Sequence, residues 1–254
     1  MSPELASPKR VLVAETVSGQ IVAMGGGGFS MEPDNPLLDD YVLSLSKRSP
    51  ARVCFLPTAG GDSPAYVARF YRSLSSRCTA SDLTLIDSML PRRPSNTSEL
   101  VDFVREQDIF YVGGGNTVHL LALWRAHGLD VLLRDAWLRG AILCGVSAGM
   151  NCWFSASITD GFGSLAPLPD GVGLLEGSAC PHYDGESTRR PAFHQAVANG
   201  FPAGYAADDG VGLHFVGREL AAVVSSRPNA KGYRVSVRDG SVVEDELATR
   251  FLGA

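Results

Sequence analysis

One serine lies among small residues at the point where an apolar strand is expected to end. The stretch GVSAG, residues 145–149, follows the apolar run AILC, residues 141–144, and a helical stretch is expected after it. The pattern G-x-S-x-G after a buried strand is typical of a nucleophile elbow, a sharp turn that lifts a serine above the sheet edge. Ser147 is therefore the candidate nucleophile, and the amide of Ala148 would face an oxyanion. The alternative interpretation is that Ser147 only caps a helix.

A serine nucleophile needs a general base, and His182 is favoured among the five histidines. It follows Cys180-Pro181, where an apolar segment breaks into a polar loop, and such a position is typical of the ligand-binding edge. His214 alternates with apolar residues and is expected to face the core from a strand. The other three, which remain alternatives with it, lie in segments of helical pattern: His119, His127 and His194.

The base needs an acid to orient it, and the sequence offers two places for one. Asp208 and Asp209 stand before a glycine at an expected strand end in YAADDGVGL. Asp160, in ITDGFG, is the rival. An acidic pair at a turn is also common without any function, so the residues alone leave the choice open.

Two glycine runs need an explanation of their own. Gly25–Gly28 does not fit the dinucleotide fingerprint, because no helix is expected after it and the next strand ends in LPT without an acid. Gly113–Gly115 lies at the carboxyl end of an expected strand, the edge where open α/β sheets bind ligands. Asn116 and Thr117 follow in the same loop, where either residue could cap the next helix, and both are counted as candidate substrate-binding residues.

Short apolar runs alternate with segments of helical spacing along the first two thirds of the chain. The runs, without polar alternation, predict parallel strands buried on both faces: residues 21–29, 52–61, 108–117 and 141–149. The helical segments are residues 36–46, 64–76, 98–107 and 119–128. We therefore expect a three-layer α/β/α fold around a mostly parallel sheet, in one domain over residues 21–254 after a lead-in over residues 1–20. The last third predicts short strands that extend the sheet or form an antiparallel flap.

Composition narrows the function classes. The net charge of −5 and the scattered basic residues argue against nucleic acid or an anionic membrane as partner. Five cysteines without C-x-x-C spacing favour reduced, buried thiols in a soluble cytoplasmic protein. No H-E-x-x-H pattern is present and the histidines are dispersed, so we expect neither a metal nor a cofactor.

Four motifs together resemble the peptidase E family of serine peptidases. VGGGNT, GVSAGM, CPHYDGESTRR and AADDGVGL occur in that family's order and spacing, and the resemblance runs from about Ile21 to Asp239. The family includes aspartyl dipeptidase and, more distantly, cyanophycinase. Its fold is similar to class I glutamine amidotransferase domains, so the resemblance implies the same three-layer architecture with extra C-terminal strands.

The resemblance also implies a role for individual residues. Ser147 would be the nucleophile and His182 the general base. Asp209 stands where the family usually has glutamate, with Asp160 kept as the alternative acid. The oxyanion hole would be the amides of Gly115 and Ala148.

Substrate recognition follows from the same resemblance. Arg189 matches the arginine that holds the substrate's aspartate carboxylate in aspartyl dipeptidases, a pairing for which guanidinium is well suited. The alternative is that Arg189 and Arg190 only cap or solvate the start of a helix. We expect a serine peptidase that cleaves dipeptides or short peptides with N-terminal aspartate, with a homodimer as a possible assembly. The rival hypotheses are a hydrolase of isoaspartyl, cyanophycin-type or broader specificity on this scaffold, and a non-enzymatic ligand-binding protein.

Overall fold

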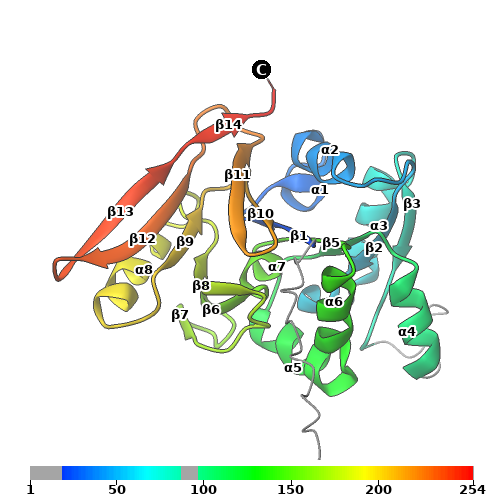
Figure 1. Cartoon of the computed structure of the whole chain (residues 1–254), viewed down its shortest axis with the longest axis horizontal. Helices are drawn as coiled ribbons and strands as arrows, with labels where there is room; N and C mark the ends of the chain where they lie inside the picture. The colour runs from blue at the N-terminus through cyan, green and yellow to red at the C-terminus, as the bar shows by residue number, and fades with distance from the viewer. Residues whose placement is uncertain (1–18, 87–96, 254) are drawn as a thin grey trace, which may run out of the picture.

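The computed structural model describes residues 19–86 and 97–253, which form two β-sheets and the helices packed on them (Figure 1). Across the first sheet the strands are β14 (Thr249–Phe251), β11 (Glu219–Ser225), β10 (Val211–Val216), β1 (Gln20–Met24), β5 (Ile142–Val146), β4 (Ile109–Val112), β2 (Arg52–Leu56) and β3 (Thr79–Asp82). Across the second they are β13 (Ser241–Leu247), β12 (Gly232–Arg238), β9 (Gly204–Ala207), β8 (Leu175–Cys180), β6 (Phe154–Thr159) and β7 (Ala166–Leu168). The helices are α1 (Gly28–Met31), α2 (Leu37–Ser44), the 3-10 turn η1 (Thr58–Gly60), α3 (Pro64–Leu74), α4 (Thr97–Arg105), α5 (Thr117–His127), α6 (Leu129–Leu138), α7 (Ala148–Asn151) and α8 (Arg189–Ala198).

The centre of the first sheet is parallel and buried on both faces. Strands β1, β5, β4, β2 and β3 pair in parallel, while β10 joins β1 antiparallel. Side chains alternate along β1, so that Ile21 and Ala23 enter one core cluster and Val22 and Met24 enter another. This two-sided burial is the reason that these strands read as continuous apolar runs in the sequence.

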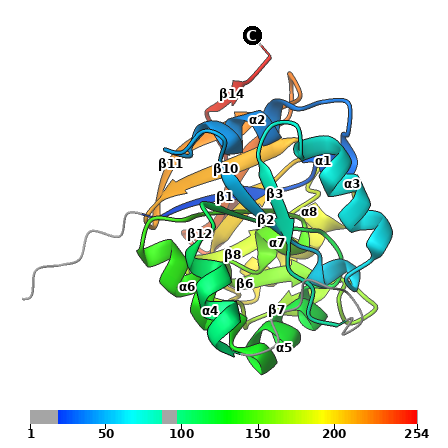
Figure 2. The same ribbon diagram turned by 90° about the vertical axis from the view of Figure 1, so that its right-hand side faces the viewer.

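Helices cover the two faces of the first sheet. The short helices α1 and α2 and the longer α3 pack on one face, while α4, α5 and α6 pack on the other (Figure 2). The second sheet shares the core of the α5–α6 face, and the rings of Phe154 on β6 and Phe215 on β10 lie 5.9 Å apart across the junction. Helix α8 covers the outer face of the second sheet.

Two predicted helix boundaries are confirmed. The side chain of Asn116 accepts a hydrogen bond from the backbone N–H of His119 at 2.9 Å, and this caps α5. Gly128 ends α5 in the left-handed conformation with φ of 69°, where a side chain would be strained. The expected buried, unpaired state of all five cysteines is also confirmed.

The α/β class and the mostly parallel sheet are confirmed, but the second sheet was not anticipated. The last third does both things expected of it: β10 and β11 extend the first sheet, and β12 and β13 form an antiparallel hairpin. That hairpin joins a separate sheet together with β6, β7, β8 and β9. Residues 1–18 of the expected lead-in lie outside the described residues, and Gln20 already begins β1.

Candidate active site

Ser147 occupies a sharp turn between β5 and α7. Its backbone has φ of 59° and ψ of −109°, a conformation that a residue with a Cβ rarely adopts. The turn is held because the Ser147 N–H donates to the carbonyl of Met24 at 3.0 Å and the Ser147 carbonyl accepts from Met150 and Asn151. Backbone strain of this kind persists only where surrounding bonds determine it. The expected elbow is present, although α7 lasts one turn before the chain enters β6.

The glycines of G-x-S-x-G have a steric reason. A Cβ on Gly145 would lie 2.7 Å from the carbonyl oxygen of Gly149, and one on Gly149 would lie 2.5 Å from that of Val112. The strand and the short helix therefore touch backbone to backbone, which only glycine allows.

His182 follows β8 of the second sheet and pairs with Asp209. The Nδ1 atom of His182 lies 2.7 Å from Oδ1 of Asp209, and both side chains are 12% exposed. A carboxylate at Nδ1 fixes the tautomer with Nδ1 protonated, so Nε2 is left to accept a proton. His182 also has a positive φ of 53°, and its N–H donates to the carbonyl of Gly25 at 3.2 Å.

Asp209 lies where the chain crosses from β9 in the second sheet to β10 in the first. Its N–H donates to Oδ1 of Asp184 at 2.8 Å. A Cβ on Gly26 would collide with the Asp209 carboxylate, and one on Gly185 would come within 2.5 Å of it. The glycine run after β1 therefore makes room for the carboxylate beside His182, which explains a motif that fits no dinucleotide site.

Asp160, the rival acid, lies elsewhere. Its side chain is 65% exposed, with an oxygen 4.0 Å from Nη2 of Arg189. The carboxylate bonded to His182 is therefore that of Asp209.

Ser147 and His182 both line one cavity of about 360 Å³. Its wall also includes Gly114, whose added Cβ would lie 3.5 Å from that of Ser147. Among the described residues no hydrogen bond links the Ser147 hydroxyl to a partner, and in free enzymes such contacts often tighten only with substrate bound. The complete wall comprises Ser30, Met31, Ser63, Ala65, Tyr66, Arg69, Gly114, Val146, Ser147 and His182.

The two amides expected to form an oxyanion hole differ in position. The N–H of Ala148 opens α7 directly after Ser147, so it has no partner within that helix. Gly115 does not line the cavity, and a Cβ there would collide with the carbonyl of Ala59. Its neighbour Gly114 does line it, but the Gly114 N–H donates to the hydroxyl of Tyr66 at 3.0 Å.

The three expected substrate-binding side chains do not line this cavity. Arg189 is 3% exposed, and its guanidinium donates to Glu186 at 2.7 Å and to the carbonyl of Ile158 at 3.2 Å. Asn116 is used by the cap of α5 and donates to the carbonyl of Gly161. Thr117 is buried and bonds to Asn151 and Thr159. The polar groups of all three side chains are therefore bonded to other parts of the protein, away from the cavity.

Helices α1 and α3 form a wall of the cavity that was not expected from the sequence. The hydroxyl of Tyr66 lies 2.5 Å from Oγ of Ser30, and burial raises the pKa of Tyr66, which keeps it a neutral donor and acceptor. Arg69 lies one turn further along α3 and also lines the cavity. The available signal was that α3 starts shortly after β2, at the carboxyl edge where the catalytic loops were expected.

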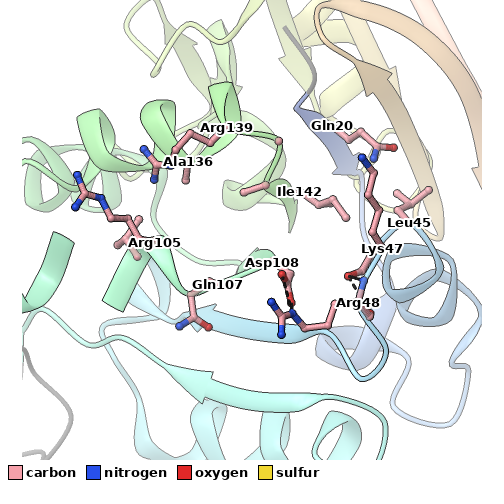
Figure 3. A pocket seen from close by; sticks show the side chains of 14 residues that line it. Gln20, Leu45, Lys47, Arg48, Arg105, Gln107, Asp108, Ala136, Arg139 and Ile142 are labelled. Carbon is pink, nitrogen blue, oxygen red and sulfur yellow. Dashed lines mark hydrogen bonds and ion pairs between the residues drawn. The ribbon is translucent and has the colours of Figure 1, made fainter. Parts of the chain in front are cut away.

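A larger cavity, of about 630 Å³, lies at the opposite edge of the first sheet (Figure 3). Gln20, Asp108 and Ile142, at the amino ends of β1, β4 and β5, contribute to its wall. Arg48 pairs with Asp108 at 3.1 Å on one side, while Arg105 and Arg139 lie on the other. The positively charged side chains are therefore spread over the opening and do not converge on one point. Among the described residues, the wall of this cavity contains no histidine and only one carboxylate, so it offers neither a serine–histidine pair nor a set of metal ligands.

Two further observations concern partners. No helix in the described ranges is long and apolar enough to cross a membrane. Within the same ranges, no three His, Cys, Asp or Glu side chains are grouped to hold a metal ion.

Relatives in sequence are peptidases. The uncharacterized peptidase YgaJ of Bacillus subtilis is 52% identical over 236 residues, which covers 92% of this chain and 99% of the relative. The uncharacterized peptidase Lmo0363 of Listeria monocytogenes is 28% identical over 156 residues, which covers 59% of this chain and 72% of the relative.

Solved structures share the fold. A peptidase from an acI-B1 actinobacterium superposes with a TM-score of 0.66 at 17% identity, covering 92% of this chain and 96% of that one. A putative peptidase E protein from Listeria monocytogenes gives a TM-score of 0.55 at 18% identity, covering 91% and 99%. The model of peptidase family S51 matches residues 21–223, most of the chain. The chain therefore belongs to peptidase family S51 and is a serine-type peptidase.

Proposed function

We propose that the protein hydrolyses dipeptides or short peptides through Ser147, His182 and Asp209, by way of an acyl-enzyme. The observation that carries the proposal is the 2.7 Å bond between His182 and Asp209, with His182 and Ser147 lining the same cavity. A nucleophile, a base and an orienting acid in this relation are the parts that acyl transfer needs. A cavity of about 360 Å³ is at the small end of ligand sites, which favours short substrates.

The first half-reaction forms the acyl-enzyme. Oγ of Ser147 attacks the scissile carbonyl carbon while Nε2 of His182 takes the hydroxyl proton. Asp209, bonded to Nδ1, stabilises the resulting imidazolium. The N–H of Ala148, which has no partner within α7, stabilises the oxyanion. Collapse of the tetrahedral intermediate breaks the C–N bond, and His182 gives its proton to the leaving amine.

The second half-reaction releases the acid. Water attacks the acyl ester as His182 removes its proton, and the proton then returns to Oγ of Ser147. Three features of the site serve both halves: the fixed tautomer of His182, the positive φ of Ser147 and the amide of Ala148. The first is fixed by the side chain of Asp209 and the other two by the backbone, so little reorganisation accompanies the reaction.

The test is peptide hydrolysis by wild type and by Ser147→Ala, measured as free amino acid released. Asp-Leu, Ala-Leu, Glu-Leu, Leu-Leu and the β-linked isoaspartyl-leucine form the panel. We expect turnover of at least one α-linked peptide by wild type, and loss of it in Ser147→Ala. Ser44→Ala, which removes an exposed hydroxyl on α2, is the matched control and should keep full activity. Turnover that survives in Ser147→Ala contradicts the proposed nucleophile, and turnover confined to the β-linked peptide contradicts the proposed substrate class.

A further inference from the structure

The wall of the Ser147 cavity carries one permanently charged side chain among the described residues, and it is a cation. Arg69 on α3 lines the cavity, and no Asp or Glu belongs to its wall. The imidazole of His182 is the other group on the wall that can carry positive charge. A wall of this composition favours an anionic group on the ligand, since nothing on it repels one.

Arg69 is anchored on one side and open on the other. Its Nη1 donates to the carbonyl of Ser30 at 3.0 Å, and its guanidinium carbon lies 5.5 Å from the ring centre of Tyr66. A guanidinium has five N–H donors, and the bond to Ser30 uses one of them. Arg69 has no ion pair with another residue in the described ranges, and its side chain is exposed. The remaining donors are thus available for a two-point bond to a carboxylate.

The same atoms connect Arg69 to the reacting serine. The ring of Tyr66, beneath the guanidinium, places its hydroxyl 3.0 Å from the N–H of Gly114. Gly114 in turn faces the side chain of Ser147. The path from the guanidinium to the nucleophile therefore runs through one tyrosine and one glycine. A carboxylate bound by Arg69 would therefore lie in the same cavity as the proposed nucleophile.

We propose that Arg69 is a specificity-determining residue that binds a carboxylate of the peptide substrate. The proposal rests on the proposed peptidase function. It moves the expected carboxylate recognition from Arg189, whose donors are taken by Glu186 and the carbonyl of Ile158, to a different helix. The carboxylate comes either from an acidic side chain beside the scissile bond or from the free C-terminus of a dipeptide, and the experiment separates the two.

The experiment measures kcat/KM for two matched substrate pairs with wild type, Arg69→Gln, Arg69→Lys and Arg72→Gln. Asp-Leu against Asn-Leu tests the side-chain carboxylate. Ala-Leu against Ala-Leu-amide tests the terminal one. Arg72 is the control, because it is an exposed arginine on the same helix and does not line the cavity.

We expect wild type to prefer the carboxylate member of one pair, which identifies the source. Arg69→Gln should lower kcat/KM for that member by roughly 10- to 100-fold and leave its neutral partner within about twofold, because a charge-assisted bond is lost. Arg69→Lys should retain part of the preference, since the charge stays while the fork geometry is lost. Arg72→Gln should behave as wild type.

Two results would overturn the inference. Equal losses on both members of a pair in Arg69→Gln would show a structural role for Arg69. An undiminished preference in Arg69→Gln would show that another group binds the carboxylate. In both cases Ser147-dependent turnover by wild type remains, so the peptidase function stands. Absence of such turnover on every peptide of either panel would instead overturn the proposed function, and this inference with it.

Discussion

The two sheets contribute to the candidate site in different ways. The first sheet supplies Ser147 and the loop of Gly114, and it does so through backbone geometry: a positive φ, glycine contacts and main-chain hydrogen bonds. The second sheet supplies His182 directly and Asp209 at the crossing back to the first, and these act through a side-chain pair. The site therefore exists only where the sheets meet, and each half is stabilised by a different kind of interaction.

Substitution of Ser147, in the part of the site that the first sheet supplies, should reduce activity most. Ser147→Gly should abolish turnover, by about 10⁵-fold or more, because the proposed nucleophile is gone. It should also raise the free energy of unfolding by about 1 kcal/mol, since glycine adopts φ of 59° without strain. Ser147→Ala is the control for the second effect because it keeps a Cβ. Urea unfolding checks it, and equal stability of the two variants contradicts the claim that the elbow is strained.

The next largest effect is on the second-sheet half. Asp209→Asn should lower kcat by about 10³- to 10⁴-fold, because the imidazolium loses its counter-charge and its preferred tautomer. Asp160→Asn should stay close to wild type, since Asp160 is exposed and lies beside Arg189. Steady-state kinetics on a substrate cleaved by wild type measures both variants. A larger loss in Asp160→Asn than in Asp209→Asn would reverse the assignment of the acid.

The buried carboxylate of Asp39 on α2 should make a contribution to stability that depends on pH. Burial raises the pKa of Asp39 to about 6, despite a hydrogen bond from Tyr111 and the nearby charge of Arg77. The folded state thus binds more protons than the unfolded state between about pH 4 and 6, so the contribution of Asp39 to stability falls as pH rises through that window.

Asp39→Asn isolates this contribution. The free energy of unfolding of wild type minus that of Asp39→Asn should decrease by up to about 3 kcal/mol between pH 4 and pH 7, from a pKa rise of about two units. Urea titrations at several pH values measure the difference. A difference that is constant with pH, or that grows with it, would show that Asp39 is not a protonated group of the core near pH 4.

A smaller loss of activity is expected from the hairpin of β12 and β13, which contacts Tyr183, the residue after His182. Glu244 on β13 accepts hydrogen bonds from the hydroxyl of Tyr183 at 2.6 Å and from Nε2 of His194 at 2.8 Å, and lies 3.2 Å from Arg190. Tyr183 follows His182, so Glu244→Gln should loosen the base and lower kcat by roughly tenfold. Glu246→Gln, on the same strand and paired with Lys231 at the surface, is the control. Equal activity of the two variants would remove Glu244 from any positioning role.

Several local features around the first sheet could be predicted from the amino-acid sequence alone. The cap at Asn116 and the end of α5 at Gly128 each depend on residues within about four positions, so their sterics and hydrogen bonds can be predicted from the local pattern. The elbow around Ser147 also has a local pattern, G-x-S-x-G, although distant contacts with Met24 and Val112 hold it in place. The parallel sheet was readable for a similar reason, because burial on both faces leaves uninterrupted apolar runs. His182 and Asp209 were candidates on the same grounds, each as a polar residue after a strand.

Which of the candidate residues meet depends on contacts between segments that are distant in the sequence. His182 and Asp209 are 27 positions apart, and the choice of Asp209 over Asp160 depends on the chain crossing between two sheets. Arg189 was expected to contact substrate, yet α8 packs on the outer face of the second sheet. The guanidinium of Arg189 is consequently buried and paired with Glu186. Arg69 had no motif to mark it. Whether a side chain reaches the cavity depends on the rotation and packing of its helix, which are set by contacts distant in the sequence and carry no local pattern.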